Sequence, residues 1–405
     1  MHAIIYIDFQ MLPTAISPAY RALMAASDLL CSWQRGDVDL SAFPLSGASY
    51  VVDRMLGKGS FASVFSAKRQ SAFEPQTRVA LKIMPRAVSS DADANAYEGC
   101  RELEIMLKLR ASAHIAQLNE YFFLDVLMDE YYCQQRLLVL VLPQFDCNLG
   151  EYISLTSDTP RLPQAQHVAG HVAQALAYIH AMGFVHRDLK LDNVLVRDNA
   201  HDRIRPLCVL ADFGHAKQLV TKQPADQGDA NCPYAFARFY RAPELLLGSS
   251  SYGPQADVWA WGCIVAEVLL SEEYLEYLFA PRHAEETDTR THTLLARMSA
   301  GQLQLLEIFE SLGTPQFDEL LAMNVHLAHD VRRQREWMRV PPRSASRPWQ
   351  TRVYQAIERH ARRGFEGQQW RVQLERATYT LQSIFQYRPN HRPTAEALRA
   401  VCWMV

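Results

Sequence analysis

Three features are missing from this 405-residue sequence, and each absence argues against a class of protein. The 41 Lys and Arg residues nearly balance the 44 Asp and Glu residues, so bulk charge favours neither nucleic acid nor an anionic membrane. The eight cysteines include no CxxC pair, which argues against a disulfide framework or a structural zinc site. No apolar run reaches the length of a membrane span, and the first residues lack the features of a signal peptide. We therefore expect an intracellular protein with reduced thiols.

The N-terminal half of the chain predicts an extension followed by a small sheet. Residues 1–46 carry no convincing period and contain several prolines and glycines, so we interpret them as a flexible extension. From Tyr50 onward, short β-rich segments at turn-like spacing predict an antiparallel sheet, and a helix is expected over about 94–110. The strand segments are YVVDRML, ASVFSAK, RVALKIM, YFFLDVL and RLLVLVL.

Beyond Pro143 the pattern becomes helical. In QAQHVAGHVAQALAYIHAMG, apolar residues recur at helical spacing, and Gly183 stands where a helix C-terminus favours glycine. The run DVWAWGCIVAEVLL is apolar all round, which predicts a helix at the centre of a larger lobe. Residues 271–300 are rich in charge and predict an insertion with solvated faces. The helical apolar positions are Val168, Val172, Leu176 and Ile179.

The stretch VHRDLKLDNVLV carries the chemistry. It brings a carboxylate at Asp188, a cation at Lys190 and an amide at Asn193 into one short loop. Asp212 follows a second apolar run, in ADFGHAK. Phosphoryl transfer needs a carboxylate to take a hydroxyl proton, oxygen ligands for Mg²⁺ and cations near the γ-phosphate. Each residue alone reads as polar loop surface, but the ordered set predicts a phosphoryl-transfer site.

With these motifs the chain resembles a eukaryotic protein kinase from about Tyr50 to its end. The resemblance implies an α+β fold of two lobes: a small antiparallel β-sheet lobe with one main helix, and a larger, mostly helical lobe. It places the kinase domain at 47–405, with the first lobe at 47–142, the hinge at 143–146 and the second lobe at 147–405.

The resemblance also implies roles for individual residues. Lys82 in VALK would bind the α- and β-phosphates of ATP and pair with Glu102. Asp188 would be the catalytic base, and Lys190 would steady the γ-phosphate. The magnesium ligands would be Asn193 and Asp212. The remaining structural positions are Glu244 of the APE segment, its buried partner Arg392, and Asp257, which would brace the catalytic loop.

The stretch LGKGSFASV resembles the glycine-rich loop that covers ATP, with one departure. Gly57 and Gly59 are kept, but the third glycine position holds Ala62. We expect a working clamp with reduced flexibility. Pro143 in the hinge removes one backbone donor and leaves the carbonyl acceptor. The implied nucleotide-binding residues are Leu56, Gly57, Lys58, Gly59, Ser60, Phe61, Val64, Ala80, Lys82, Leu142, Phe145 and Leu195.

Several strings are similar to the CMGC group of kinases, and within it to the glycogen synthase kinase 3 family. They are RELEIM, DFGHAKQLV, YAFARFYRAPELLLG and QLQLLEIFESLGTPQ. The resemblance implies that Tyr234 is phosphorylated, with Arg238 and Arg241 as nearby cations. The alternative is a packing tyrosine in the substrate groove.

The same resemblance implies a pocket for a phosphate that the substrate already carries. Arg101, Arg187 and Lys217 match three cations that bind a phosphate four residues C-terminal to the new site. Two alternatives stay open. Arg187 could serve the protein's own activation loop, or acidic residues of that loop, at 226 and 229, could occupy the cations.

The expected function is a serine/threonine protein kinase that uses ATP and Mg²⁺ and prefers pre-phosphorylated protein substrates. The runner-up is a proline-directed kinase of the cyclin-dependent or mitogen-activated type. A pseudokinase scaffold is a third reading, disfavoured because Lys82, Asp188 and Asp212 are all present. We expect a monomer, located in the cytoplasm and also the nucleus, that binds scaffold proteins but neither nucleic acid nor membranes.

Overall fold

A computed structural model describes the chain in two compact units. The first takes in Met1–Ala111 and Ala116–Phe145, and the second takes in Ser112–Ile115 and Asp146–Val405. The predicted extension at 1–46, the expected phosphosite Tyr234 and the loop residues 59–61 lie outside the described residues. The described residues are 50–58, 62–69, 77–85, 98–128, 133–199, 201–219, 236–270, 277–280, 299–323, 349–364 and 369–401.

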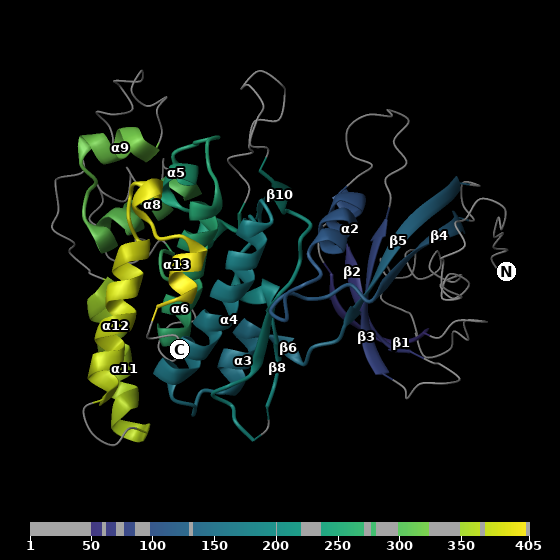
Figure 1. The fold of residues 1–405 in the computed structure, drawn as a ribbon, viewed down its shortest axis with the longest axis horizontal. Coiled ribbons are helices and arrows are strands. Elements are labelled where there is room, and N and C mark those ends of the chain that lie inside the picture. The colour runs from purple at the N-terminus through teal and green to yellow at the C-terminus, as the bar shows by residue number, and fades with distance from the viewer. Residues whose placement is uncertain are drawn as a thin grey trace, which may run out of the picture. The chain divides into compact units, whose positions relative to one another are not determined.

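Where the structure describes it, the first unit is an antiparallel sheet with a helix (Figure 1). Its strand order is β1-β2-β3-β5-β4, and α2 (Glu98–Lys108) is its helix among the described residues. The predicted strands and helix are confirmed, with the described helix beginning at 98. The strands are β1 (Tyr50–Lys58), β2 (Ser63–Arg69), β3 (Thr77–Pro85), β4 (Glu120–Met128) and β5 (Cys133–Pro143).

The second unit is mostly helical, as predicted. The α-helices among its described residues are α3 (Leu149–Leu155), α4 (Arg161–Ala181), α5 (Pro243–Leu246), α6 (Pro254–Leu270), α8 (Ala300–Leu312), α9 (Phe317–Met323), α11 (Trp349–Gly364), α12 (Gln369–Ile384) and α13 (Ala395–Arg399). Short strands form two small sheets. One has the order β6-β8-β9, from β6 (Cys147–Asn148), β8 (Val194–Arg197) and β9 (Leu207–Leu210), and the other pairs β7 (Phe184–Val185) with β10 (Lys217–Gln218). The 3-10 turns in the described part of the second unit are η3 (Leu191–Asn193), η4 (Arg238–Tyr240) and η6 (Pro389–His391).

Helix α6 is the centre of the second unit. Every residue from Ala256 to Leu270 is buried, and the helix packs against α4, α11 and α12. A β-carbon at Gly262 would lie 2.7 Å from Ile384 Cγ2, at the end of α12. Since real β-carbons do not approach other atoms so closely, the packing of α12 on α6 requires glycine at this position.

Helix α4 has the buried face that the sequence predicts. Its four periodic apolar residues are all at most 2% exposed. Gly183 follows the helix with φ +79°, a backbone conformation that favours glycine. The chain can therefore turn at once into β7, which leads to the catalytic loop.

A buried ion pair joins α5 to the C-terminal part of the second unit. Arg392 Nη1 and Nη2 each donate to a carboxylate oxygen of Glu244 at 2.7 Å. The same guanidinium donates to the carbonyl oxygens of Gln386 and Gln255 and lies over the ring of Trp259. The partner of Glu244 expected from the resemblance is thus present, with both oxygens of the carboxylate satisfied.

One expectation about residues 271–300 was wrong where the structure describes them. Leu278 and Phe279 are 1% and 0% exposed, so this short stretch is core rather than a solvated face. The Phe279 ring stacks on Trp259 of α6, with centroids 5.5 Å apart. The polar composition of the surrounding residues predicted an exposed segment, but this apolar pair is buried because the segment packs on the central helix through Phe279. Ser299 caps the N-terminus of α8, so that helix begins inside the predicted insertion.

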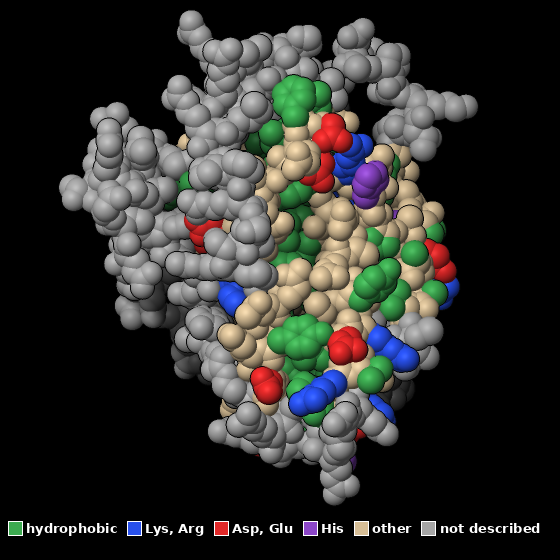
Figure 2. All heavy atoms as spheres, turned by 90° about the vertical axis from the view of Figure 1, so that its left-hand side faces the viewer, with side chains coloured by type: hydrophobic (Ala, Val, Ile, Leu, Met, Phe, Trp, Pro, Cys, Tyr) green, Lys and Arg blue, Asp and Glu red, His purple; other side chains and the backbone are tan. Residues whose placement is uncertain are grey.

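Figure 2 shows one face of the molecule, where apolar side chains stand in separate groups among charged and polar atoms. Isolated exposed apolar side chains are normal on a protein surface. In the described part of the chain, no helix has the length and apolarity needed to cross a bilayer.

Candidate active site

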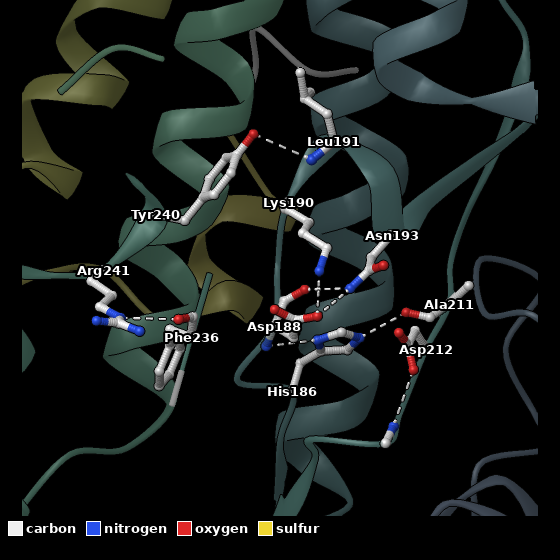
Figure 3. A network of polar contacts seen from close by, with 11 residues as sticks. His186, Asp188, Lys190, Leu191, Asn193, Ala211, Asp212, Phe236, Tyr240 and Arg241 are labelled. Carbon is white, nitrogen blue, oxygen red and sulfur yellow. Dashed lines mark hydrogen bonds and ion pairs between the residues drawn. The ribbon is translucent and has the colours of Figure 1, made fainter. Parts of the chain in front are cut away.

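The loop after β7 holds Asp188 in a fixed orientation. Lys190 Nζ and Asn193 Nδ2 both donate to Asp188 Oδ2 at 2.8 Å (Figure 3). Asn193 Nδ2 also donates to the Asp188 carbonyl oxygen at 2.7 Å. Asp188 Oδ1 makes no hydrogen bond within the described residues. The three polar residues that the sequence singled out therefore form one cluster, with one carboxylate oxygen open.

His186 connects this loop to the end of β9. Its Nδ1 accepts a hydrogen bond from the Asp188 backbone N–H at 3.3 Å, and its Nε2 donates to the Ala211 carbonyl oxygen at 3.0 Å. Burial lowers the pKa of His186, in keeping with a neutral ring that accepts at one nitrogen and donates at the other. The ring thus ties the backbone of Asp188 to the residue preceding Asp212 (Figure 3).

Asp257, near the start of α6, holds the backbone of the catalytic loop through hydrogen bonds. Its carboxylate accepts hydrogen bonds from the backbone N–H groups of His186 at 2.8 Å and Arg187 at 3.0 Å. His180 Nε2 lies 2.9 Å from the same carboxylate. Arg187 has φ +67°, a conformation that costs on the order of 1–3 kcal/mol for a residue with a β-carbon. These hydrogen bonds stabilise the strained loop, as the resemblance implied.

Asn193 and Asp212 lie at the same end of the β8–β9 ladder. The ladder places Val194 opposite Leu210, and the Ala211 N–H donates to the Asn193 carbonyl oxygen at 2.9 Å. Asp212 has φ +63°, and its Oδ1 accepts a hydrogen bond from the Gly214 N–H at 3.4 Å. The two residues expected to hold magnesium therefore flank the same end of the ladder: Asn193 directly precedes β8, and Asp212 lies two residues after β9.

The donor set of this pair fits magnesium. Asn193 directs its Nδ2 toward two oxygens of Asp188, so its Oδ1 is the amide atom left for another partner. Amide and carboxylate oxygens are the hard ligands that Mg²⁺ prefers. Within the described residues, no group of three or more His, Cys, Asp or Glu is placed to hold a metal ion. Mg²⁺ at this pair would therefore complete its coordination with water or phosphate oxygens.

Sequence reasoning missed a buried acid behind the loop. The Tyr240 hydroxyl donates to Glu267 Oε2 at 2.7 Å and accepts from the Leu191 N–H at 3.4 Å. Burial raises the pKa of Glu267 to about 8, so this carboxyl is mostly protonated at neutral pH. The only sequence signal was a lone glutamate in the apolar run of α6. Through Tyr240, this helix also supports the residue next to Lys190.

Two of the three predicted phosphate-binding cations lie on neighbouring segments of the second unit. Lys217 in β10 pairs with Val185 in β7, and beyond this ladder Arg187 Nε donates to the His215 carbonyl oxygen at 2.6 Å. Arg187 is 8% exposed, whereas Lys217 is partly exposed. Arg101, the third cation, is exposed on α2 of the first unit.

The cations expected beside Tyr234 are both described. Arg238 is exposed and lies over the ring of Phe239, with its guanidinium carbon 5.2 Å from the centroid. Arg241 Nε donates to the Phe236 carbonyl oxygen at 3.0 Å (Figure 3). Arg241 therefore supports the backbone of the segment that follows Tyr234.

The first unit contains the lysine and glutamate pair that the resemblance implied. Lys82 Nζ in β3 donates to Glu102 Oε1 in α2 at 2.7 Å. The glutamate side chain is 3% exposed and that of the lysine is 12% exposed. Screening by water is therefore weak, and the pair fixes the ammonium group relative to the sheet.

The residues expected to contact adenine share a sheet face with this lysine. Val64 lies opposite Lys82, and Ala80, two residues before Lys82, lies opposite Leu142. Because side chains alternate along a strand and directly opposite residues share a face, these four occupy one face of the sheet. Phe145 is partly exposed in the first unit and Leu195, in β8, is partly exposed in the second.

The glycine-rich stretch is only partly described. Leu56 is 40% exposed, Gly57 and Lys58 are exposed at the end of β1, and Ala62 is partly exposed just before β2. Apart from its two chain neighbours, no described residue has an atom within 4 Å of a β-carbon built at Gly57. Among the described residues, Gly57 thus has open space where a side chain would stand.

A sheet with one helix, a helical unit and a loop that gathers an acid, a lysine and an amide define a phosphotransferase of the kinase class. Comparison with known families agrees. The family described as the protein kinase domain matches residues 50–404. The chain therefore belongs to the protein kinase family.

Proposed function

We propose that this kinase transfers the γ-phosphate of ATP to serine or threonine hydroxyls of protein substrates. The observation that carries the proposal is the arrangement around Asp188, which holds one carboxylate oxygen with two donors and leaves the other open. Oδ1 would accept the proton of the substrate hydroxyl as that oxygen attacks the γ-phosphate. Lys190, at 2.8 Å from the carboxylate, would stay close to the charge on the transferring group.

The remaining residues would orient the nucleotide. Lys82, fixed by Glu102, would bind the α- and β-phosphates, and the sheet face with Val64 and Ala80 would contact the adenine ring. Asn193 and Asp212 would hold Mg²⁺, which offsets phosphate charge and fixes the geometry of ATP.

We also propose that the enzyme belongs with the glycogen synthase kinase 3 family and prefers primed substrates. The support is the closeness of the segments that carry Arg187 and Lys217, together with an exposed Arg101. Arg187 is largely buried, so an ion pair with a phosphate oxygen would be weakly screened. Charge-assisted hydrogen bonds contribute about 1.5–3 kcal/mol each, enough to set the register of a substrate.

A peptide assay tests both proposals. The full chain is given Mg-ATP and a serine peptide with or without a phosphoserine four residues C-terminal, and Asp188→Asn is the blank. We expect the primed peptide to be preferred by about tenfold or more in kcat/KM. We expect the blank to lose about 10²–10⁴-fold in kcat.

Matched lysine variants separate the pocket from general charge. Lys217→Met should reduce turnover of the primed peptide only, while Lys68→Met, on exposed β2 surface, should change neither peptide. Equal turnover of both peptides by the wild type would reject priming and leave the kinase assignment standing. A strong preference for proline after the acceptor would favour the proline-directed alternative, and no turnover above the blank would favour the pseudokinase.

A further inference from the structure

The guanidinium of Arg187 is held by two neutral acceptors. Its Nε donates to the His215 carbonyl oxygen at 2.6 Å, and its Nη1 donates to the Tyr252 hydroxyl at 3.2 Å. A guanidinium has five N–H bonds in a rigid plane, so these contacts fix the plane and use two of them. Within the described residues, three N–H bonds of this group remain for an anion.

Tyr252 is itself fixed from two sides. It lies two residues before α6, and its ring packs edge-on against Phe236 with centroids 5.5 Å apart and planes at 78°. Phe236 is 5% exposed and has φ +77°, and its carbonyl oxygen accepts from Arg241. The hydroxyl of Tyr252 therefore has a defined position relative to both Arg187 and the segment that ends the activation loop.

We propose that Tyr252 is a positioning residue that orients Arg187 to bind the priming phosphate. This inference rests on the proposed preference for primed substrates. A phosphate oxygen binds best to a guanidinium edge that already faces it, because less rotational freedom is lost on binding. Without the hydroxyl, Nη1 loses an acceptor, and the contact with His215 is then the one described side-chain hydrogen bond that defines the plane of Arg187.

The effect should be confined to primed substrates. Asp188 is held by Lys190 and Asn193, and none of these three side chains has a hydrogen bond to Tyr252 within the described residues. Chemistry at the open oxygen of Asp188 therefore does not need the hydroxyl. The substitution should raise the KM for a primed peptide and leave kcat unchanged.

The test is Tyr252→Phe, which keeps the ring that packs on Phe236 and removes the hydroxyl. We expect the KM for the primed peptide to rise about threefold to tenfold, as for the loss of one hydrogen bond. We expect kcat, and kcat/KM for the unprimed peptide, to stay within about twofold of wild type. The matched control is Tyr379→Phe, since this residue of α12 is 75% exposed and should change neither peptide.

A double-mutant cycle shows whether Tyr252 acts through Arg187. In an Arg187→Lys background there is no Nη1 to orient, so adding Tyr252→Phe should change the primed KM no further. An equal additional rise in that background would overturn the inference, since the hydroxyl would then act elsewhere.

The outcomes separate this inference from the proposed function. If the wild type ignores priming, the phosphate pocket and the role of Tyr252 fall together, and the kinase assignment does not. If the wild type prefers the primed peptide, and Tyr252→Phe has the same KM and kcat as the wild type for both peptides, only the proposed role of Tyr252 is wrong. An equal loss with both peptides would make Tyr252 a support of the catalytic loop and would also reject the inference.

Discussion

The two units hold their functional residues in different ways. In the second unit, Asp188 and Asp257 are buried, and each carboxylate has two or more hydrogen-bonding partners. In the first unit, Lys82 forms a largely buried ion pair with Glu102, and the end of β1 is exposed, with Leu56 at 40%. The catalytic loop is therefore held by several hydrogen bonds, whereas the first unit holds its lysine with a buried ion pair and leaves the end of β1 exposed.

This difference indicates where each unit tolerates change. Buried polar networks are rigid when every member is satisfied and costly when one is removed. The pair of Lys82 with Glu102 joins β3, the middle strand of the sheet, to α2 and decides where one charged group lies. Because the flexible Lys82 side chain is still 12% exposed, its ammonium group can reach water when the pair is broken, which limits the loss of stability. Loss of a buried structural partner in the second unit should therefore appear as unfolding, and loss of the charge that holds Lys82 as lost activity in a folded protein.

The largest expected effect is on the stability of the second unit. Arg392→Met removes the partner of Glu244, which is buried and would keep an unpaired charge. Breaking a buried pair in this way costs about 3–5 kcal/mol, which denaturant unfolding of the full chain would measure. Arg388→Met is the control, because the pair of Arg388 with Asp318 is largely exposed and should contribute less than about 1 kcal/mol. Similar losses for the two variants would contradict the comparison.

An intermediate effect is expected in the first unit, on activity. Glu102→Gln removes the charge that holds Lys82, and a charge-assisted hydrogen bond of about 1.5–3 kcal/mol corresponds to roughly a 10- to 150-fold loss in kcat/KM for ATP. We expect the melting temperature to change by no more than about 2–4 °C. Glu104→Gln, at an exposed position of the same helix, should leave both quantities unchanged. Unfolding of the Glu102 variant at room temperature would reject the contrast.

Three histidine rings in the second unit pack together, and one of them, His114, comes from the segment 112–115. The His171 ring on α4 lies between those of His114 and His167, with centroids 4.2 Å from each. His171 Nδ1 accepts from the Cys208 N–H at 3.2 Å, and His167 Nε2 lies 2.9 Å from the Pro206 carbonyl oxygen. Burial, with the two neighbouring imidazoles, lowers the pKa of His171 to about 3. The pKa of His167 is also lowered, chiefly by burial.

The smallest expected effect is a dependence of stability on pH. Because the folded state keeps His171 neutral below pH 6.5 while the unfolded chain gains a proton, stability should fall as the pH decreases from about 6.5. Allowing for partial exposure, His171 should account for up to about 1 kcal/mol of loss between pH 7.5 and 5.5. His171→Asn keeps an acceptor for the Cys208 N–H and should flatten this slope. His201→Asn, at an exposed turn, should not, and an unchanged slope in the His171 variant would contradict the assignment.

The sequence predicted the local structure well because local patterns determine it. The five strands, the buried faces of α4 and α6, and the loop with Asp188 follow from periodicity and motif. The sequence did not predict the hydrogen bond between Tyr240 and Glu267, or the burial of Leu278. Both depend on how segments far apart in the chain pack on α6, and no short pattern encodes that pairing.

The candidate site also has parts that the sequence predicted and parts that it did not. The pairs of Lys82 with Glu102 and of Glu244 with Arg392 were implied by motifs that resemble the family, and both are present. The role of Tyr252 had no sequence signal, because a tyrosine before a helix is unremarkable until its hydroxyl is placed against Arg187. Tyr234 and residues 59–61 lie outside the described residues and stay predictions.

Ile384 of α12 lies so close to Gly262 of α6 that the packing of these two helices should affect how much folded kinase a cell contains. A methyl group there would force α12 away from α6, and overpacking of this kind costs about 1–3 kcal/mol. Gly262→Ala should therefore raise the fraction of unfolded chains, which cellular proteases remove, while each folded molecule keeps its catalytic loop. The result would be a temperature-sensitive allele, in which warming cells lowers kinase abundance and leaves turnover per molecule unchanged.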